Sequence, residues 1–280
     1  MPTMMYDITE RVAVLRRYYD ELLAAKIARI SELSGVEASR MVPINPVDFI
    51  ERNKYQRIDG YEYRQIRKWL MATKTEDNFL ISPLDEDVET ANQIMYKSGQ
   101  TSMKLRASKC ELMPVPGVVA KAFYLKNHRQ SPPLISSSSV SWALVWSGQI
   151  VACMTYDICD GAVRGQKGNH YELLRLALKH GFQISGGASR LQKHCEEALR
   201  QLGETEVFGY SNATINNGHV YGQLGFECKG CDGGQPFVIM RDNRLVRLVN
   251  LFPETTLARL AEAGRIKTHI GGNKYWVKKI

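Results

Sequence analysis

One nine-residue segment, Gln183-Ile-Ser-Gly-Gly-Ala-Ser-Arg-Leu191, constrains the fold of this chain most strongly. Its apolar start, its glycine pair and the amphipathic run after it predict a strand end, a tight turn and the beginning of a helix. Such a turn directs several backbone N–H groups to one point, where the helix dipole also favours negative charge. The segment therefore predicts an anion-binding turn between a sheet and a helix.

A second segment, Tyr221-Gly-Gln-Leu-Gly-Phe226, follows thirty residues later. It predicts a short helix over 218–224 that carries a tyrosine, and then a strand that opens at Phe226. A phenol of pKa about 10 is a suitable proton donor to a departing thiolate of similar pKa. The two segments together indicate a pyrophosphate site with a phenol nearby, as in an enzyme that moves an acyl group from a carrier thiol.

The order of elements between residues 103 and 240 predicts an α+β fold with a mixed sheet flanked by helices. Expected elements are a strand at 103–110, a helix at 118–126, a hairpin of 140–145 with 149–156, and a strand at 169–178. They are followed by a helix at 188–202, a strand at 206–210, the short helix, a strand that opens at Phe226 and a strand at 236–240.

Three regions are expected along the chain. Residues 1–100 form a helical, basic N-terminal region with a long helix at 9–34, and residues 101–240 form the catalytic domain. Residues 241–280 form a basic C-terminal unit, with a small helix at 255–263 and a hairpin of 265–270 with 274–277 around Gly271-Gly272-Asn273.

Two features of the N-terminal region leave alternatives open. Residues 9–42 fit either a helix-turn-helix or a plain helical hairpin, because Ser34-Gly35 separates a long helix from a second short helical stretch. Residues 47–72 interleave aromatic residues with arginine, as surfaces that contact nucleic acid do. An amphipathic helix with buried aromatics has the same pattern.

Composition narrows the class of protein. A net charge of +8 favours a polyanionic partner, and the basic residues concentrate near the two ends of the chain. Six cysteines are too few for a disulfide scaffold. Cys228 and Cys231 have the spacing of a zinc ligand pair, with Cys153 and Cys159 as the remaining candidates, but reduced thiols are the simpler interpretation and we predict no metal. The absence of long apolar runs and of a signal-peptide pattern predicts a cytoplasmic protein without a membrane partner.

The motifs resemble those of a known enzyme family. Gln183-x-x-Gly186-x-Ala188 is similar to the phosphate loop of the GNAT acyltransferases, and Tyr221-x-x-Leu-Gly-Phe226 is similar to a later motif of that family. A longer pattern over residues 104–226 resembles the phage branch that includes the Mom-type DNA modification enzymes; it includes Lys104-Leu-Arg106, Asn127-His128 and Tyr171-Glu-Leu-Leu-Arg175. The resemblance implies acetyl-CoA as donor and DNA as partner. It also implies a phage protein that transfers an acetamido group to adenine N6 and so protects DNA from restriction.

Donor-side residues follow from the glycine turn. Glycine lacks a Cβ, so backbone N–H groups can approach a diphosphate closely, and the first helical turn adds further donors. The expected cofactor-binding residues are Gln183, Gly186, Gly187, Ala188, Ser189, Arg190 and Leu191.

Catalytic and acceptor-side candidates lie on both flanks of that turn. Tyr221 is expected to protonate the leaving thiolate, and His128, Glu172 and Asn212 are the other catalytic candidates. The odd separation of Glu172 and Arg175 predicts that they lie on opposite faces of a regular strand. The expected substrate or DNA contacts are Arg106, Arg175, Ser211, Lys267 and Lys274.

Three hypotheses stand after the sequence alone. The first is a CoA-dependent, Mom-like modifier of DNA bases, with salt-sensitive DNA affinity. The second is a GNAT acetyltransferase that acts on a protein or a small amine, for which DNA binding would be weak. The third is a non-catalytic DNA-binding module on the same scaffold, for which CoA would fail to bind. Nothing in the sequence indicates an oligomeric state.

Overall fold

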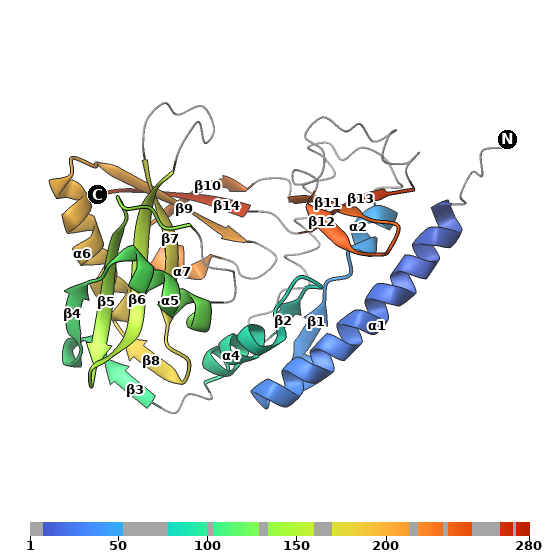
Figure 1. The fold of residues 1–280 in the computed structure, drawn as a ribbon, viewed down its shortest axis with the longest axis horizontal. Coiled ribbons are helices and arrows are strands. Elements are labelled where there is room, and N and C mark those ends of the chain that lie inside the picture. The colour runs from blue at the N-terminus through green and yellow to red at the C-terminus, as the bar shows by residue number, and fades with distance from the viewer. Residues whose placement is uncertain are drawn as a thin grey trace.

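A computed structural model describes residues 8–52, 78–99, 103–128, 134–159, 170–212, 218–231, 235–247, 264–270 and 273–280. These residues form two parts that lie side by side (Figure 1). One part is a seven-stranded sheet with helices on both faces. The other, which we call the second lobe, combines N-terminal helices with a three-stranded sheet from much later in the chain.

The seven-stranded sheet has the strand order β10-β14-β9-β7-β6-β5-β4. Its strands are β4 (Glu111–Pro114), β5 (Val140–Trp146), β6 (Gln149–Cys159), β7 (His170–Leu178), β9 (Glu206–Asn212), β10 (Glu227–Cys231) and β14 (Asn273–Lys279). Neighbouring strands are antiparallel except for β7 and β9, which are parallel. The prediction of a mixed sheet flanked by helices is confirmed.

The hairpin of β5 and β6 shows why local sequence specifies part of this sheet. Ser147 and Gly148 both have positive φ, at 49° and 73°. Two consecutive residues in this conformation make the type of turn whose twist matches that of the flanking strands. The turn and the alternating apolar residues therefore place this hairpin where the sequence predicts it.

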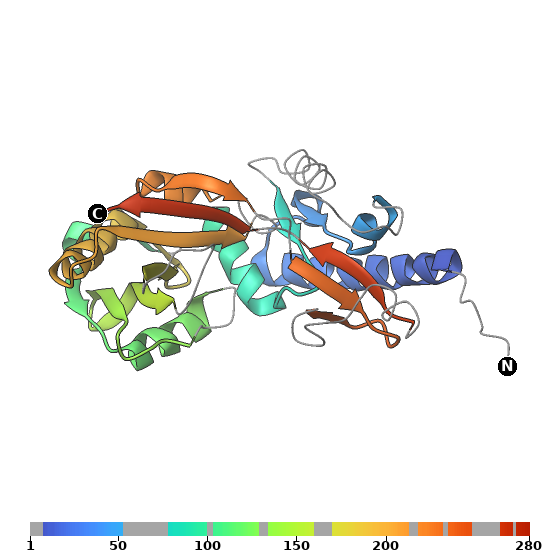
Figure 2. The same ribbon diagram turned by 90° about the horizontal axis from the view of Figure 1, so that it is seen from above.

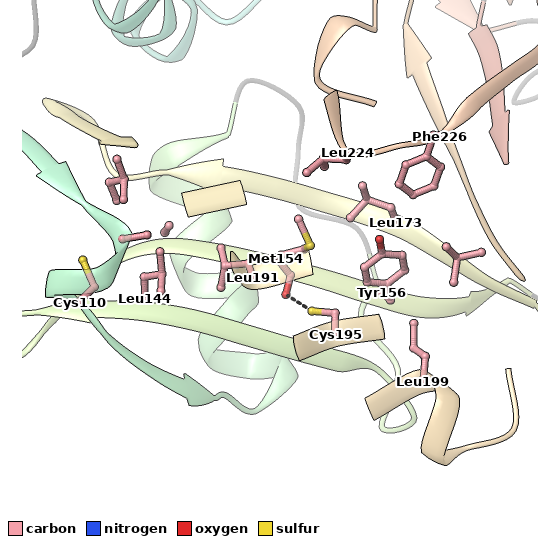
Figure 3. Close-up of a cluster of buried hydrophobic side chains, with 14 of the residues drawn as sticks. Cys110, Leu144, Met154, Tyr156, Leu173, Leu191, Cys195, Leu199, Leu224 and Phe226 are labelled. Atoms are coloured by element: carbon pink, nitrogen blue, oxygen red, sulfur yellow. Dashed lines mark hydrogen bonds between the residues drawn. The ribbon is translucent and has the colours of Figure 1, made fainter. Parts of the chain in front are cut away.

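Two helices cover opposite faces of the sheet. Helix α6 (Gly187–Gln201) is amphipathic, and it buries Leu191, Cys195 and Leu199 against Met154 and Tyr156 of β6. Figure 3 shows these side chains filling the layer between the helix and the sheet. Since Leu191 is fully buried, its truncation to alanine would cost about 2–5 kcal/mol of stability.

Helix α5 (Gly117–Asn127) packs on the other face. It buries Ala120, Phe123 and Tyr124 against Cys153 of β6 and Ala177 of β7. Residues of β6 that alternate between the two clusters confirm that the two helices lie on opposite sides of one sheet.

The second lobe begins with α1 (Ile8–Ser34), followed by η1 (Ala38–Arg40), β1 (Met41–Pro43), α2 (Val47–Arg52), β2 (Phe79–Ile81) and α4 (Asp87–Lys97). Strands β1 and β2 are parallel partners. The lobe is completed by β11 (Gln235–Ile239), β12 (Leu245–Arg247) and β13 (Ile266–Ile270), which form a sheet in the order β12-β11-β13.

Contacts between distant segments hold this lobe together. Ile239 of β11 packs in one buried cluster with Val12 and Leu15 of α1. The Tyr19 hydroxyl donates to the Asn243 carbonyl at 2.6 Å, and the Thr268 hydroxyl donates to the Pro46 carbonyl at the same distance. Strands β11, β12 and β13, which lie between β10 and β14 in the sequence, therefore pack with the N-terminal helices, as Figure 2 also shows.

The expected C-terminal hairpin is wrong in its pairing. Strands form at both predicted places, but β13 pairs with β11 in the second lobe, whereas β14 pairs with β9 and β10 in the large sheet. The glycine-rich link suited a hairpin locally, but partners from elsewhere in the fold determine the pairing. The expected helix at 255–263 lies outside the described residues.

The helix-turn-helix alternative is also wrong. After Gly35 the chain forms only the three-residue η1 before β1 starts at Met41. Pro43 cannot continue a helix, and Met41 is buried in a core cluster with Leu23 and Ile81. Most of the aromatic and basic segment at 47–72 lies outside the described residues.

Candidate active site

The parallel strands β7 and β9 diverge soon after they start. Their register joins only Tyr171 with Val207 and Glu172 with Phe208. Beyond Phe208, β9 continues to Asn212 with β14 as its neighbour on the other side. The sheet is therefore open between β7 and β9 next to Glu172, and backbone groups of both strands face that opening.

A β-bulge in β7 brings Glu172 and Arg175 to the same face of the sheet. Glu172 lies opposite Asp157 of β6 and Arg175 lies opposite Thr155, so that Leu174 is an extra residue in the register. Asp157 and Thr155 are two positions apart and share a face. The prediction that Glu172 and Arg175 lie on opposite faces is wrong, because it assumed a regular strand.

Hydroxyl groups on the α5 side hold this bulge. The Tyr124 hydroxyl donates to the carbonyl of Arg175 at 3.3 Å and shares a hydrogen bond of 2.8 Å with Thr155 Oγ1. Thr155 in turn is 2.8 Å from Ser141 Oγ. The backbone that follows the bulge is thus bonded to a buried chain of three hydroxyls, whose partners come from α5, β6 and β5.

Tyr221 lies at the opening between β7 and β9, on the short helix α7 (His219–Gln223). Its hydroxyl donates to the carbonyl of Tyr210 at 2.9 Å, two residues beyond Phe208, the last residue of β9 that pairs with β7. A Cβ on Gly209 would be 2.5 Å from the Tyr221 ring, so glycine is needed for this close approach. The predicted short helix with its tyrosine is confirmed.

The electrostatic surroundings link Tyr221 to the bulge. Burial raises the pKa of the Tyr221 phenol and the Glu172 carboxylate raises it further, whereas Arg175 and the hydrogen bond to Tyr210 lower it. Burial lowers the pKa of Arg175, and Glu172 opposes that shift. Glu172, Arg175 and Tyr221 therefore act on one another, and Tyr221 is a protonated phenol at neutral pH.

The glycine turn forms the beginning of α6, as predicted. Gly186 is the N-cap residue with φ of 75°, in the left-handed region, and as a glycine it has no side chain with which to cap the helix. A Cβ on Gly187 would lie 3.1 Å from Ile184, so a larger residue there would crowd the turn. The N–H groups of the first turn therefore remain available to an anion.

An open pocket of about 700 Å³ lies at this helix start. It is lined by Arg106, Ala107, Ser108, Ser185, Gly186 and Arg190. Backbone amides that the glycine turn leaves accessible, together with two guanidinium groups, are donors of the kind that a diphosphate requires. The residues present therefore fit the phosphate-bearing end of a nucleotide donor.

The other residues expected to bind the donor differ in how exposed their side chains are. Gln183 and Ser189 are exposed and Ala188 is half-buried beside the turn. The Leu191 side chain is in the core, so only its backbone can contribute to the site. Arg190 Nη1 donates to the carbonyls of Ala107 and Cys110, which ties the guanidinium to the preceding segment.

The catalytic candidate Asn212 and the substrate-contact candidates Ser211, Lys267 and Lys274 lie on β9, β13 and β14. Ser211 is buried and accepts a hydrogen bond of 2.8 Å from Trp276 Nε1. Asn212 ends β9 opposite Asn273, and Lys274 on β14 has its Nζ 6.0 Å from the Trp276 ring centre. Lys267 is in β13 of the second lobe and is not in the same sheet as Lys274.

His128 is the C-cap residue of α5. Its backbone N–H donates to the Tyr124 carbonyl, and its ring lies edge-on to the Tyr124 ring at 6.4 Å. A catalytic role for His128 stays a prediction.

Sequence reasoning missed two residues that shape the site. Trp276 stacks on Tyr221, and Tyr124 bonds to the backbone after the bulge. The Tyr221 motif contains no signal for a ring partner 55 residues later in the chain. The apolar pattern of α5 gave only a core position for Tyr124.

Neither a metal cluster nor a membrane span emerges from the described ranges. No group of three or more histidine, cysteine or acidic side chains is close enough there to hold a metal ion. Cys153 is fully buried beside Tyr124, whereas Cys228 is exposed on β10. Within the same residues, helices that combine the length and the hydropathy needed to cross a bilayer do not occur.

Comparison with known proteins supports the family suggested by the motifs. Residues 113–226 match the model of the acetyltransferase (GNAT) family. No curated protein has significant sequence similarity to the chain.

Similar solved structures include the IAA acetyltransferase from Bacillus cereus, with a TM-score of 0.39 and 12% identity over 61% of this chain and 99% of that one. They also include the ribosomal-protein-S18-alanine N-acetyltransferase from Escherichia coli, with a TM-score of 0.39 and 13% identity over 61% of this chain and 94% of that one. A third is a GNAT family acetyltransferase from Elizabethkingia anophelis with acetyl-CoA bound. Its TM-score is 0.38, with 11% identity over 61% of this chain and 99% of that one.

Proposed function

We propose that this protein transfers an acyl group from acetyl-CoA to an amine, because residues 113–226 match the model of the GNAT acetyltransferase family. The observation that carries the proposal is the position of the Tyr221 hydroxyl, at the opening between β7 and β9 and within the electrostatic influence of Glu172. A proton donor and a carboxylate thus lie at one gap in the sheet, and α6 begins beside an anion pocket in the same domain.

The roles of the residues follow from their chemistry. The thioester of acetyl-CoA supplies an activated carbonyl carbon and a thiolate leaving group. Backbone amides of Gly187, Ala188 and Ser189 would hold the diphosphate at the start of α6. Tyr221 holds a proton on its hydroxyl for the departing sulfur, and Glu172 accepts the proton of the attacking amine.

The acceptor that we propose is an exocyclic amine of a DNA base. Three aromatic residues, Phe208, Tyr210 and Tyr275, form a ring cluster with centroid distances of 5.4–6.1 Å. Phe208 is buried beside Glu172 in the strand register, whereas Tyr210 and Tyr275 are partly exposed and offer the rings for stacking. Stacking on an aromatic ring is worth about 1–3 kcal/mol per base, and a base inside a duplex must leave the stack to be modified.

Charge supports the same acceptor. The net charge of +8 favours the phosphate backbone of a nucleic acid over a neutral substrate. Within this proposal, the resemblance to Mom-type enzymes supports adenine N6 as the amine. Acetyl-CoA would leave an acetyl group on that nitrogen, whereas an acetamido product would require a donor that also carries the amide nitrogen. The resemblance also supports a phage protein that works in the cytoplasm of its host.

The test is mass spectrometry of nucleosides from DNA that has been incubated with the purified protein and acetyl-CoA. The same measurement on DNA from cells that express the protein tests for other donors. One nucleoside should gain mass, and the gain distinguishes an acetyl from an acetamido group. Tyr221→Phe and Glu172→Gln should each lower the yield at least tenfold, because they remove the proton donor and the carboxylate.

Tyr18→Phe is the matched control, since Tyr18 is an exposed tyrosine on α1 and should leave the yield unchanged. Release of CoA in the presence of a peptide or a small amine, with unmodified DNA, would instead support the second hypothesis from the sequence. Failure of the wild type to bind CoA would support the third hypothesis, a DNA-binding module.

A further inference from the structure

A two-stranded parallel sheet adjoins the anion pocket. Strand β3 (Met103–Arg106) pairs with β8 (Phe182–Ser185), which runs directly into the glycine turn. Strand β8 alternates between buried and exposed residues, and β3 alternates between half-buried and exposed residues. Their outward-facing pairs are Lys104 with Gln183 and Arg106 with Ser185.

The register carries Arg106 to the pocket. Because the strands are parallel and in register, Arg106 ends β3 at the level where Ser185 ends β8, one residue before Gly186. The following residues, Ala107 and Ser108, turn along the same cavity wall. This wall comes from a segment that precedes residue 113, where the family match begins.

The two arginines of the pocket differ in what they already bind. The Arg190 guanidinium donates to the backbone carbonyls of Ala107 and Cys110, and so fixes the wall in place. Arg106 is exposed, and its guanidinium has no hydrogen bond or ion pair with any described residue. Arg106 therefore retains all of its guanidinium donors for a ligand, whereas Nη1 of Arg190 is already bonded to two carbonyls. A guanidinium matches the oxygens of a phosphate in bidentate geometry.

We propose that Arg106 binds a phosphate group of the nucleotide half of the acyl donor. The inference rests on the proposed use of acetyl-CoA and moves Arg106 from the acceptor side, where the sequence placed it, to the donor side. The β3–η2 segment (η2, Ala107–Lys109) thereby supplies a second wall of the donor site and favours donors that carry phosphate.

Calorimetric titration of the full chain tests this assignment with three probes: CoA, 3′-dephospho-CoA and pantetheine, which has no phosphate. Arg106→Gln should weaken CoA binding at least tenfold and leave pantetheine binding unchanged. Arg106→Lys should have an intermediate effect, because it keeps the charge and loses the bidentate geometry. If Arg106→Gln weakens the binding of CoA but not of 3′-dephospho-CoA, Arg106 contacts the 3′-phosphate. If the variant weakens the binding of both equally, Arg106 contacts the diphosphate. Either result supports the proposal.

Lys109→Gln is the matched control, since Lys109 is an exposed cation in η2 that does not line the pocket. It should bind all three probes as the wild type does. The proposal is overturned if Arg106→Gln binds CoA within twofold of the wild type, or if it loses DNA affinity and keeps CoA affinity. If the wild type itself fails to bind CoA, the proposed function falls as well, so the two failures are distinguishable.

Discussion

The Tyr221 ring lies on the indole of Trp276, with ring centroids 5.4 Å apart and planes only 10° from parallel. The same indole donates from Nε1 to the buried Ser211 hydroxyl. Tyr221 thus has its ring fixed by a residue of β14 and its hydroxyl fixed by the backbone of β9. The tyrosine at the candidate site is held from two sides.

Ser211→Ala removes the acceptor of the Trp276 indole N–H and leaves that donor buried. The free energy of unfolding should fall by about 1–3 kcal/mol, as measured by urea denaturation. Ser138→Ala, at an exposed serine of the loop before β5, should change it by less than about 0.5 kcal/mol. Equal stability of Ser211→Ala and the wild type would show that the indole does not depend on this bond.

Tyr124→Phe removes the hydroxyl that bonds to Thr155 and to the carbonyl after the β7 bulge. Stability should fall by about 1–3 kcal/mol. The rate of acetyl transfer should also fall, because the bulge places Glu172 and Arg175 on one face. Urea denaturation and a CoA-release assay measure the two effects, with Tyr18→Phe as control. Full activity in a destabilised Tyr124→Phe protein would limit this hydroxyl to a structural role.

Lys278 and Glu196 join β14 to α6 through an ion pair of 2.6 Å, in which the Glu196 side chain is only 7% exposed. Lys278→Met leaves a buried carboxylate with Gln192 and Arg200 as its remaining partners, and should lower stability by about 1–3 kcal/mol. Lys279→Met, at the exposed neighbour, is the control.

A double variant of this pair gives a sharper test. If the two side chains interact, Lys278→Met with Glu196→Gln should be less destabilised than the sum of the single variants. Strict additivity in denaturation experiments would argue against a coupled pair.

Alkaline pH should destabilise the protein through Tyr221. Burial raises the pKa of this phenol in the folded state, while the unfolded chain titrates near a pKa of about 10. Its contribution to stability is complete below that value and is lost as the pH rises, because the unfolded chain releases the proton and the folded protein retains it.

Between about pH 9 and 11, the wild type should therefore lose stability more steeply than Tyr221→Phe, by at most about 1.4 kcal/mol per pH unit. Denaturation at a series of pH values measures the two slopes. Parallel slopes would mean that the phenol ionises in the folded protein as easily as in water.

Tyr156→Phe should leave stability unchanged or raise it. The Tyr156 hydroxyl is buried in the core between β6 and α6, and it has no hydrogen-bond partner among the residues that the structure describes. An unpaired buried hydroxyl costs about 1–3 kcal/mol, which the substitution removes. A fall in melting temperature would reveal a partner for this hydroxyl.

Features specified by a few consecutive residues were predictable from the sequence. The turn at Gly186, the short helix with Tyr221 and the Ser147-Gly148 hairpin each carry a local signal, in glycine at positive φ or in apolar spacing. The mixed sheet followed from the order of such elements.

Features specified by distant partners were not predictable. Leu174 carries no local mark of a bulge, so the shared face of Glu172 and Arg175 emerged only from the pairing with β6. The hydrogen bond that Ser211 accepts from Trp276 joins residues 65 positions apart, so no local pattern indicates it. Arg106 reaches the donor pocket only because β3 pairs with a strand that comes much later in the chain.

The position of β14 has a consequence for biosynthesis. During translation, β9, α7 and β10 leave the ribosome well before the strand that must separate β9 from β10, because the strands of the second lobe intervene. Until β14 arrives, both strands expose unpaired edges that invite aggregation, and Tyr221 lacks the indole beneath it. The nascent domain is therefore incomplete, and its active site unassembled, until almost the whole of this sequence has been synthesised.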